Sequence, residues 1–214
     1  MRVLIACEFS GAVRRAFAAR GHDAWSCDIL PAEDGSNKHI VGDARDILGD
    51  GWDLLAVFHP PCTRLCKSGL RWLHTPPPGR ELAEMWADLD EAAALFSAFW
   101  NCSIPRIAIE NPTMHRHAKA RIVNYRPPTQ TIQPWWFGHG ETKATDLYLR
   151  ELPSLKPTNI VPGREARVHK TPGGPNQWRK RSRTFPGVAD AMADQWGDVD
   201  GLTPTQRDLF ERAA

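Results

Sequence analysis

Short apolar segments alternate with amphipathic ones along the first half of this chain, and this order is the feature that most constrains its fold. The apolar segments predict strands at residues 3–7, 24–29, 39–43, 53–58 and 106–110. Helix-like segments stand between them, notably residues 12–20 and the long amphipathic stretch 81–100. Strands that alternate with helices favour a parallel sheet with helices on its faces. The predicted fold class is therefore an α/β fold with a doubly wound, mostly parallel sheet.

The pattern changes after Pro112. The elements expected there are two strands at 130–137 and 145–149, a helix at 185–196, and a short last helix opened by the capping box Thr203-Pro204-Thr205-Gln206. A Gly-His-Gly turn separates the two strands, which predicts an antiparallel hairpin at the edge of the sheet. The residues between the fourth strand and about Arg80 are expected to form a loop.

Length and composition indicate one well-cored domain. The chain has 214 residues, of which 42% are hydrophobic, and we expect residues 1–214 to form a single domain. Its apolar runs are far shorter than the roughly 20 residues that span a bilayer, and the chain enters a strand at once, with no room for a signal peptide. The five cysteines are scattered and odd in number. A protein with reduced thiols, located in the cytoplasm and not bound to a membrane, is therefore expected.

Positive charge gathers in one place. The net charge of +2 does not by itself indicate a nucleic-acid-binding protein, but residues 164–183 hold seven Lys or Arg against one Glu. Glycines and prolines lie among these cations. Such a loop suits contacts to phosphates, and Trp178 could stack on a base. The alternative is a solvated surface loop.

Acidic residues follow the first strands and predict a cofactor site. The turn Glu8-Phe9-Ser10-Gly11 lies between the first strand and a helix, where backbone N–H groups can approach a cofactor. Asp28 ends the second strand and suits the hydroxyls of a ribose. Asp43, which ends the third, could receive an adenine amino group. Together they suggest an adenosine-containing cofactor, unless Asp28 and Asp43 only cap turns.

A cysteine follows the fourth predicted strand. The segment Phe58-His59-Pro60-Pro61-Cys62-Thr63 leaves an apolar run and turns through two prolines before the thiol. Open α/β folds keep their ligands at the carboxyl ends of strands. Thiolate attack needs a nearby positive or donor group, and Arg64 and Lys67 are close in sequence. Cys62 is therefore a candidate nucleophile; the alternative is a small buried hydrophobic residue.

A metal site is a weaker interpretation of the same cysteine. Cys62 and Cys66 could be two ligands, but no second pair with matched spacing exists. Cys102, His115 and His117 would complete such a site poorly. No metal is therefore expected.

Glu110 ends the fifth apolar strand, where a carboxylate is unfavourable unless it has a partner or a function. Such a carboxyl group could donate a proton to a ring nitrogen and polarise the ring for attack. Glu110 is therefore a candidate acid opposite Cys62. Asn111 could simply hold the turn before Pro112.

With Pro61-Cys62 after one strand and Glu110-Asn111 after the next, the chain resembles the DNA (cytosine-5) methyltransferases. That family carries Pro-Cys and Glu-Asn-Val at these two places. Residues 137–145 are similar to the family segment Tyr-Gly-Val-Pro-Gln-x-Arg-x-Arg, with Lys143 at the first arginine. The resemblance implies the S-adenosylmethionine-dependent methyltransferase type of sheet, with Cys62, Glu110 and Lys143 as catalytic residues. The small size would suit an enzyme of a phage or mobile element.

The same resemblance implies the cofactor and the substrate contacts. S-Adenosyl-L-methionine would be held by Phe9, Ser10, Gly11, Asp28, Ile29, Asp43 and Pro61. Nucleic acid would be held by Arg64, Lys67, Arg179, Lys180, Arg181 and Arg183. The family's large target-recognition domain has no counterpart of similar length, so a basic loop at 156–184 is expected to take its place.

The chemistry that the resemblance implies begins with addition of Cys62 to carbon 6 of cytosine. Glu110 would bond N3 and the exocyclic amine, and carbon 5 would then take the methyl group. Loss of the carbon-5 proton and of Cys62 would release the product. In a duplex the base must first be flipped out.

Two alternatives to a DNA methyltransferase stay open. The same chemistry could act on a pyrimidine nucleotide or on single-stranded nucleic acid, which need no duplex-reading domain. The chain could also be a non-catalytic nucleic-acid-binding module on a methyltransferase scaffold. Val13, Pro112 and Thr145 favour that third interpretation, because each departs from a family motif.

Overall fold

A seven-stranded sheet organises the computed structural model, which describes residues 1–57, 60, 62–167 and 182–198. Its strands are β1 (Arg2–Ala6), β2 (Asp23–Asp28), β3 (His39–Val41), β4 (Leu54–Val57), β5 (Arg106–Asn111), β6 (Gln130–Ile132) and β7 (Thr145–Arg150). Their order is β3-β2-β1-β4-β5-β7-β6. The first five strands pair in parallel, whereas β7 runs antiparallel to both β5 and β6. The predicted fold class and the antiparallel edge pair are therefore confirmed. The strand predicted at 130–137 is too long, because it ends at Ile132 and a 3-10 helix occupies residues 134–136.

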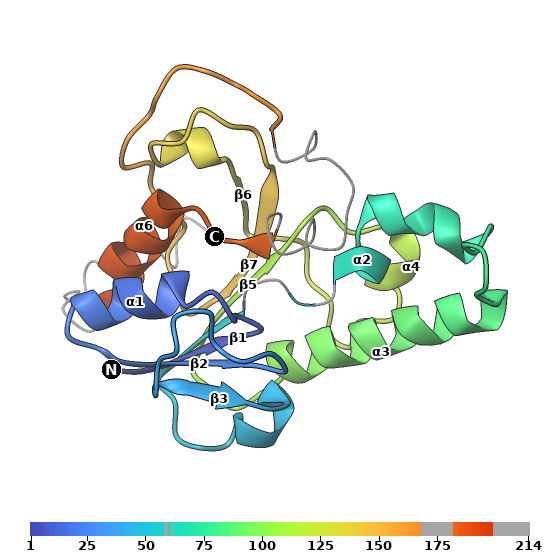
Figure 1. The fold of residues 1–214 in the computed structure, drawn as a ribbon, viewed down its shortest axis with the longest axis horizontal. Helices are drawn as coiled ribbons and strands as arrows, with labels where there is room; N and C mark the ends of the chain where they lie inside the picture. The colour runs from blue at the N-terminus through green and yellow to red at the C-terminus, as the bar shows by residue number, and fades with distance from the viewer. Residues whose placement is uncertain (58–59, 61, 168–181, 199–214) are drawn as a thin grey trace.

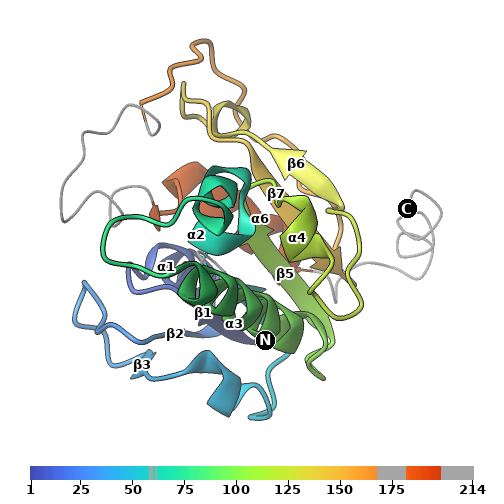
Figure 2. The ribbon, with the colours of Figure 1, turned by 90° about the vertical axis from the view of Figure 1, so that its right-hand side faces the viewer.

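Helices cover both faces of this sheet (Figure 1). The longer helices are α1 (Ala12–Ala19), α3 (Leu82–Trp100) and α6 (Pro186–Gly197). Short helical segments are α2 (Cys62–Leu65), α4 (Arg116–Lys119), and the 3-10 helices η1 (Ala44–Ile47), η2 (Lys67–Leu73) and η3 (Pro134–Trp136). Helices α1 and α6 pack together on one face, and α3, α2 and α4 lie on the other (Figures 1 and 2). The sheet is therefore doubly wound.

Alternation along the strands divides the core between the two faces. In β1, Val3 and Ile5 belong to the cluster with α1 and α6, whereas Leu4 and Ala6 belong to the cluster with α3. All four side chains are fully buried. Burying a side chain of the size of Val3, Leu4 or Ile5 contributes roughly 1.5–3 kcal/mol. The central strands are thus apolar on both sides, as parallel strands between two helical layers must be.

The predicted loop before Arg80 is wrong in part, because α2 and η2 occupy residues 62–73. Leu65 and Leu73 are buried there in the cluster that includes α3. Elements of four and seven residues are too short to show a helical period in the sequence, so packing against α3 decides their structure. The last helix expected from Thr203 lies outside the described residues.

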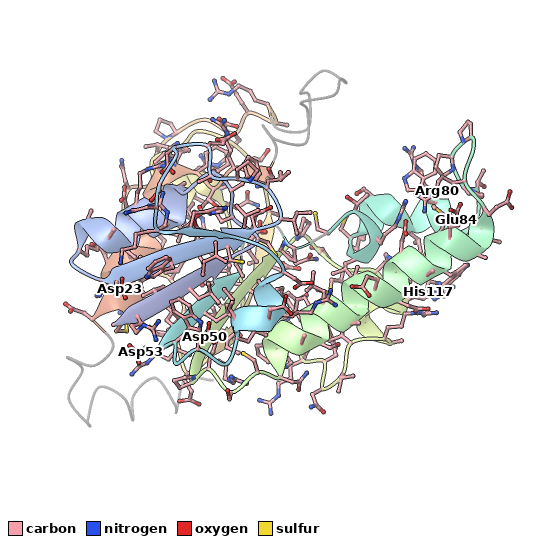
Figure 3. The ribbon with its side chains drawn as sticks, turned by 60° about the horizontal axis from the view of Figure 1, so that its bottom comes forward. Asp23, Asp50, Asp53, Arg80, Glu84 and His117 are labelled. Carbon is pink, nitrogen blue, oxygen red and sulfur yellow. The ribbon has the colours of Figure 1, made fainter. Side chains whose placement is uncertain are left out.

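Polar contacts close the amino ends of the strands. The Arg2 backbone N–H donates to the Asp53 carboxylate at 2.7 Å, and its guanidinium donates to the Asp50 carbonyl at 2.6 Å and lies 3.8 Å from Asp23. Figure 3 shows the three aspartates gathered at one end of the molecule, far from Arg80, Glu84 and His117 around the distal part of α3. The opposite, carboxyl edge of the strands carries the predicted site.

Candidate active site

The carboxyl ends of β4 and β5 bring the predicted nucleophile and acid to neighbouring positions. Val57 of β4 pairs with Ile109 of β5, so Glu110 stands one residue beyond the last pair of these two strands. Cys62 begins α2 after a short connection in which Pro61 lies outside the described residues. Two short apolar strands side by side thus carry both motifs to one edge of the sheet.

Glu110 and Lys143 both act electrostatically on Cys62. A hydrogen bond to Cys66 raises the pKa of the Cys62 thiol, and burial and the Glu110 carboxylate raise it further, whereas the Lys143 ammonium lowers it. Glu110 is only 6% exposed. The three predicted catalytic residues, taken from distant parts of the sequence, are therefore grouped around one sulfur atom.

A small open pocket adjoins this group. Its cavity volume is about 30 Å³, and it is lined by residues of β5, β6, β7, α6 and their loops: Glu110, Ile132, Pro134, Lys143, Thr145, Thr184, Phe185, Val188 and Met192. The pocket brings Glu110 of β5 and Lys143, which precedes β7, to one opening.

Cys66 is a feature of the site that sequence reasoning considered only as a metal ligand. The Cys62 and Cys66 thiols are hydrogen-bonded to each other, and the Cys66 sulfur lies 3.0 Å from the Ser68 hydroxyl. The hydrogen bond with Cys62 lowers the pKa of the Cys66 thiol, aided by Ser68 and the Gly69 N–H group. The spacing Cys62-x-x-x-Cys66 on a helical turn is the sequence signal that could have revealed this pair.

The segment after β5 clamps the segment that carries Cys62. The backbone N–H of His115 donates to the Leu65 carbonyl at 3.1 Å, and that of Lys67 donates to the Thr113 carbonyl at 3.1 Å. The buried His115 ring bonds the Arg64 carbonyl through Nε2 at 2.7 Å, while its Nδ1 accepts from the Ala118 N–H at 3.2 Å. Sequence reasoning missed this clamp, because its partners lie about fifty residues apart.

The predicted cofactor turn contains a buried carboxylate. Glu8 is 1% exposed, and it accepts hydrogen bonds from the N–H groups of Val13 at 2.8 Å and Arg14 at 3.2 Å and from the Ser10 hydroxyl at 3.3 Å. Burial raises the pKa of Glu8, against the effect of these donors. Two N–H groups of the first turn of α1 are thus satisfied within the protein and do not face a ligand.

Phe9 and Gly11 complete this turn. Phe9 is buried, with 5% of its surface exposed, and its carbonyl accepts from the Glu33 N–H at 2.9 Å. Gly11 has φ 67° just before α1, a left-handed conformation that side chains disfavour. A Cβ there would lie 2.6 Å from the Arg14 guanidinium and 2.8 Å from the Asp34 carboxylate. Glycine is therefore favoured by the left-handed backbone conformation, and a side chain there would also displace the ends of these two side chains.

Asp28 and Asp43 lie at the carboxyl ends of β2 and β3, as predicted. Asp28 accepts from the Leu30 N–H at 2.9 Å, and burial raises the pKa of its carboxyl group. Asp43 caps η1 through the Arg45 N–H at 2.9 Å and pairs with the Arg45 guanidinium at 2.6 Å, which lowers the pKa of Asp43. Both aspartates thus cap turns, which is the alternative to cofactor binding. Each nevertheless lies at the carboxyl edge of the sheet, where a ligand could bind.

Two apolar side chains are exposed beside these acids. Ile29, which follows Asp28, is 77% exposed, and Val41, which pairs with Asp28 across β2 and β3, is 59% exposed. Exposed β-branched side chains flanking a half-buried carboxylate suit a flat, partly polar ligand. Sequence reasoning named Ile29 and missed Val41.

The predicted nucleic-acid-binding residues differ in where the structure places them. Arg64 is largely buried and pairs with Asp88 at 3.1 Å. Lys67 is exposed beside Cys66. Arg183 pairs with Glu33 at 2.9 Å, which joins the segment before α6 to the loop after β2. The remaining three, Arg179, Lys180 and Arg181, lie outside the described residues, as does Trp178.

Within the described parts of the chain, no group of three or more His, Cys, Asp or Glu side chains could hold a metal ion. Over the same residues, no helix is both long enough and apolar enough to cross a membrane.

Comparison with known proteins adds one structural likeness. No family model matches the chain, and no curated protein matches it. Among solved structures, the chain is similar to a candidate DNA modification methyltransferase encoded within an E. coli prophage, with 12% sequence identity and a TM-score of 0.45. The alignment covers 76% of this chain and 52% of the other, so this chain spans about half the length of that protein.

Proposed function

We propose that this protein is an S-adenosylmethionine-dependent methyltransferase that methylates carbon 5 of cytosine in DNA through covalent addition of Cys62. The observation that carries the proposal is the grouping of Cys62, Glu110 and Lys143 at the carboxyl ends of two adjacent parallel strands. A thiol, an acid and a cation in one place are what addition to a pyrimidine requires.

Each of the three side chains has a chemical task in this proposal. The Cys62 sulfur adds to carbon 6 of the base, and the Lys143 ammonium favours the thiolate, as its effect on the pKa of Cys62 indicates. Glu110, nearly buried, donates to N3 and so stabilises the enamine that forms. After methylation, loss of the carbon-5 proton expels the Cys62 sulfur and restores the ring.

The edge formed by β2 and β3 fits the adenosine part of the cofactor. Asp28 offers a carboxylate to ribose hydroxyls, and the exposed Ile29 and Val41 can cover a flat ring. S-Adenosylmethionine supplies an electrophilic methyl group when bound. The N–H groups of Val13 and Arg14 donate to Glu8. The carboxylate of the cofactor would therefore be bound by other hydrogen-bond donors.

The first test measures methyl transfer from labelled S-adenosylmethionine to DNA. We expect Cys62→Ala to abolish transfer and Glu110→Gln to reduce it by about 10²–10⁴-fold, the range typical of positioned acids. Duplexes containing 5-fluorocytosine should trap a covalent protein–DNA adduct in the wild type and none in Cys62→Ala, because fluorine blocks the last elimination.

Cys102→Ala serves as the matched control, since Cys102 is a half-buried thiol outside the site. Its transfer rate should equal that of the wild type. Unchanged transfer in Cys62→Ala would overturn the proposed mechanism.

A second candidate keeps the chemistry and changes the substrate to a pyrimidine nucleotide or to single-stranded nucleic acid. The observation that favours it lies between β7 and α6, where the described residues 151–167 contain no helix or strand that could form a recognition domain. Comparing labelled transfer to dCMP, to a single strand and to a duplex separates the two substrates.

Calorimetric titration with S-adenosylhomocysteine separates both enzymes from a non-catalytic nucleic-acid-binding module. Binding that weakens in Asp28→Ala supports the cofactor site at β2 and β3. Absence of binding in the wild type would favour the module, whose DNA binding should nevertheless persist and depend on salt.

A further inference from the structure

His139 lies in the loop after η3, and the backbone of this loop is fixed from several sides. The His139 N–H donates to the Pro134 carbonyl at 3.2 Å, and the His139 carbonyl accepts from the Glu141 N–H at 2.6 Å. Gly138 has a positive φ of 88°, which glycine adopts without strain, and its N–H donates to the Asn159 carbonyl at 2.8 Å. The loop therefore holds the His139 ring in one place beside α6.

The His139 ring contacts the start of α6 in two ways. The Gly187 N–H, in the first turn of the helix, donates to His139 Nε2 at 3.1 Å. The centroids of the His139 and Phe185 rings lie 5.0 Å apart. A backbone N–H can only donate, so Nε2 must be the unprotonated nitrogen that accepts. This contact thus requires the neutral ring with its proton on Nδ1.

The same end of α6 forms a wall of the pocket beside Glu110. The residues that line the pocket include Phe185 and Val188 from this end of the helix, together with Glu110 and Lys143. The Val188 N–H donates to the Phe185 carbonyl at 3.0 Å, so both wall residues belong to the turn that the histidine ring contacts. A shift of this turn would move the apolar wall relative to Glu110 and Lys143.

Protonation of His139 opposes this contact. A proton on Nε2 removes the acceptor and places a positive charge at the N-terminal end of α6, which already carries a partial positive charge. The first turn of α6 holds no acidic side chain that could compensate. Burial lowers the pKa of His139, against the effect of the Glu141 carboxylate. The ring is therefore neutral at pH 7 and takes up its proton only in acid.

Glu141 is the carboxylate that acts on the ring, and it is itself paired with Arg167 at 3.0 Å. Charged side chains of the neighbouring segments form further pairs with one another: Arg167 with Glu165, Arg20 with Asp190 and Asp194 of α6, and Arg183 with Glu33. These pairs leave the hydrogen bond to α6 as the contact that depends directly on the protonation of His139.

We propose that neutral His139 is a positioning residue for the pocket beside Glu110, and that acid releases α6 from it. In the neutral form, Nε2 accepts from the Gly187 N–H and keeps Phe185 against the ring, which fixes the apolar wall of the pocket. When Nε2 takes up a proton, this hydrogen bond is lost and the wall loses its position. The effect on methyl transfer rests on the proposed function, whereas the contact with α6 does not.

Titration by NMR tests the contact without any substrate. The isotope-labelled full chain is followed from about pH 5 to about pH 8, the range in which histidine titrates. The signals of His139 are identified by their absence in His139→Gln. We expect its imidazole to titrate below the ordinary value of about 6.5 and to carry its proton on Nδ1 when neutral. Titration at or above about 6.5, or a neutral ring with its proton on Nε2, would overturn the proposal.

Two variants separate a hydrogen-bond acceptor from a ring that only fills space. In His139→Gln, the amide oxygen can accept from the Gly187 N–H but does not titrate. In His139→Ala, no acceptor remains, so its urea midpoint should lie below that of the wild type at neutral pH, whereas that of His139→Gln should stay close to the wild type. An alanine variant as stable as the wild type, or a glutamine variant no more stable than the alanine variant, would contradict the positioning role.

The pH dependence of stability tests the protonation step. Because the pKa of His139 is lowered by folding, the unfolded chain binds more protons than the folded chain as the pH falls below about 6.5. The wild type should therefore lose stability from about pH 6.5 downward, to a greater extent than His139→Gln. His74→Gln, at an exposed histidine, is the matched control and should keep the wild-type loss. Equal losses in the wild type and in His139→Gln would contradict the release of α6 in acid.

Methyl transfer then links the contact to the reaction. Below the pKa of His139, KM of the wild type should rise by up to about tenfold for each pH unit, and this rise should be absent from His139→Gln. If the enzyme is active but both proteins show the same KM profile, His139 does not position the pocket. Absence of transfer in the wild type, together with the expected NMR and urea results, would contradict the proposed function and leave the contact between His139 and α6 standing.

Discussion

His115 connects the two motifs of the candidate site at the scale of a single residue. Its ring is 3% exposed, bonds the Arg64 carbonyl through Nε2 and accepts from the Ala118 N–H through Nδ1. Both ring nitrogens are therefore engaged, one with the segment that carries Cys62 and one with the start of α4. This pattern requires the neutral ring that carries its proton on Nε2.

Replacing His115 should weaken the contacts that hold the segment carrying Cys62. His115→Ala leaves the partly buried Arg64 carbonyl without its donor, which costs about 1–3 kcal/mol of unfolding free energy. Urea denaturation measures that loss, and methyl transfer should fall with it. His115→Gln, which can still donate to the carbonyl, should recover part of both.

His74→Ala is the control, because His74 is exposed at the end of η2. Its stability should stay within about 0.5 kcal/mol of the wild type, as is usual for surface substitutions. Equal stability losses at His74 and His115 would contradict the clamp.

At the scale of elements, the position of α6 depends on one close contact between its backbone and a loop. Gly187 in its first turn lies against the loop after η3: its N–H donates to His139 Nε2 at 3.1 Å, and a Cβ would lie 1.9 Å from the Phe137 carbonyl oxygen. Backbone cannot give way as a flexible side chain does. Since Val188 and Met192 of α6 also line the pocket beside Glu110, the seating of this helix shapes the candidate site.

Gly187→Ala should therefore displace α6. We expect a loss of about 1–3 kcal/mol, the usual effect of overpacking, measured by urea denaturation, together with a change in methyl-transfer KM as the pocket walls move. Gly49→Ala is the matched control, because nothing lies within 4 Å of a Cβ there and its φ is unstrained. A Gly187 variant as stable as the Gly49 variant would contradict this packing.

At the scale of the whole molecule, the two edges of the sheet carry different kinds of side chain. The strand amino ends carry a network of Arg2 with aspartates (Figure 3), and the carboxyl ends carry the candidate site. The cations of residues 164–183 stand out in a chain whose net charge is only +2. In the proposed function these cations would supply the contacts to DNA phosphates.

The salt dependence of DNA binding tests this assignment. Changing Arg179, Lys180 and Arg181 together to Ala should lower the slope of log affinity against log salt by up to about 0.9 for each DNA phosphate that is no longer neutralised. Fluorescence anisotropy with a labelled duplex measures the slope. Lys38→Ala, at the amino edge beside Asp23, should leave it unchanged. An unaltered slope in the triple variant would mean that other cations bind the phosphates.

Much of the fold could be predicted from sequence because its strands are short, apolar and separated by helices of the expected length. The predicted strands 53–58 and 106–110 agree with β4 and β5 to within one or two residues. The segment 62–73 could not be predicted, since α2 and η2 are shorter than any detectable period and depend on burial of Leu65 and Leu73.

For the candidate site, sequence alone determined which residues follow strands: Cys62, Glu110, Asp28 and Asp43 each come directly after an apolar run or close to it, and parallel strands carry such residues to one edge. Only the tertiary structure decided what each touches. Cys62 is hydrogen-bonded to Cys66, and Asp43 pairs with Arg45. The position of a residue along the chain decides at which edge of the sheet it lies. Its hydrogen bonds and ion pairs depend instead on which atoms come within a few ångströms. Those distances exist only once segments far apart in sequence have packed together.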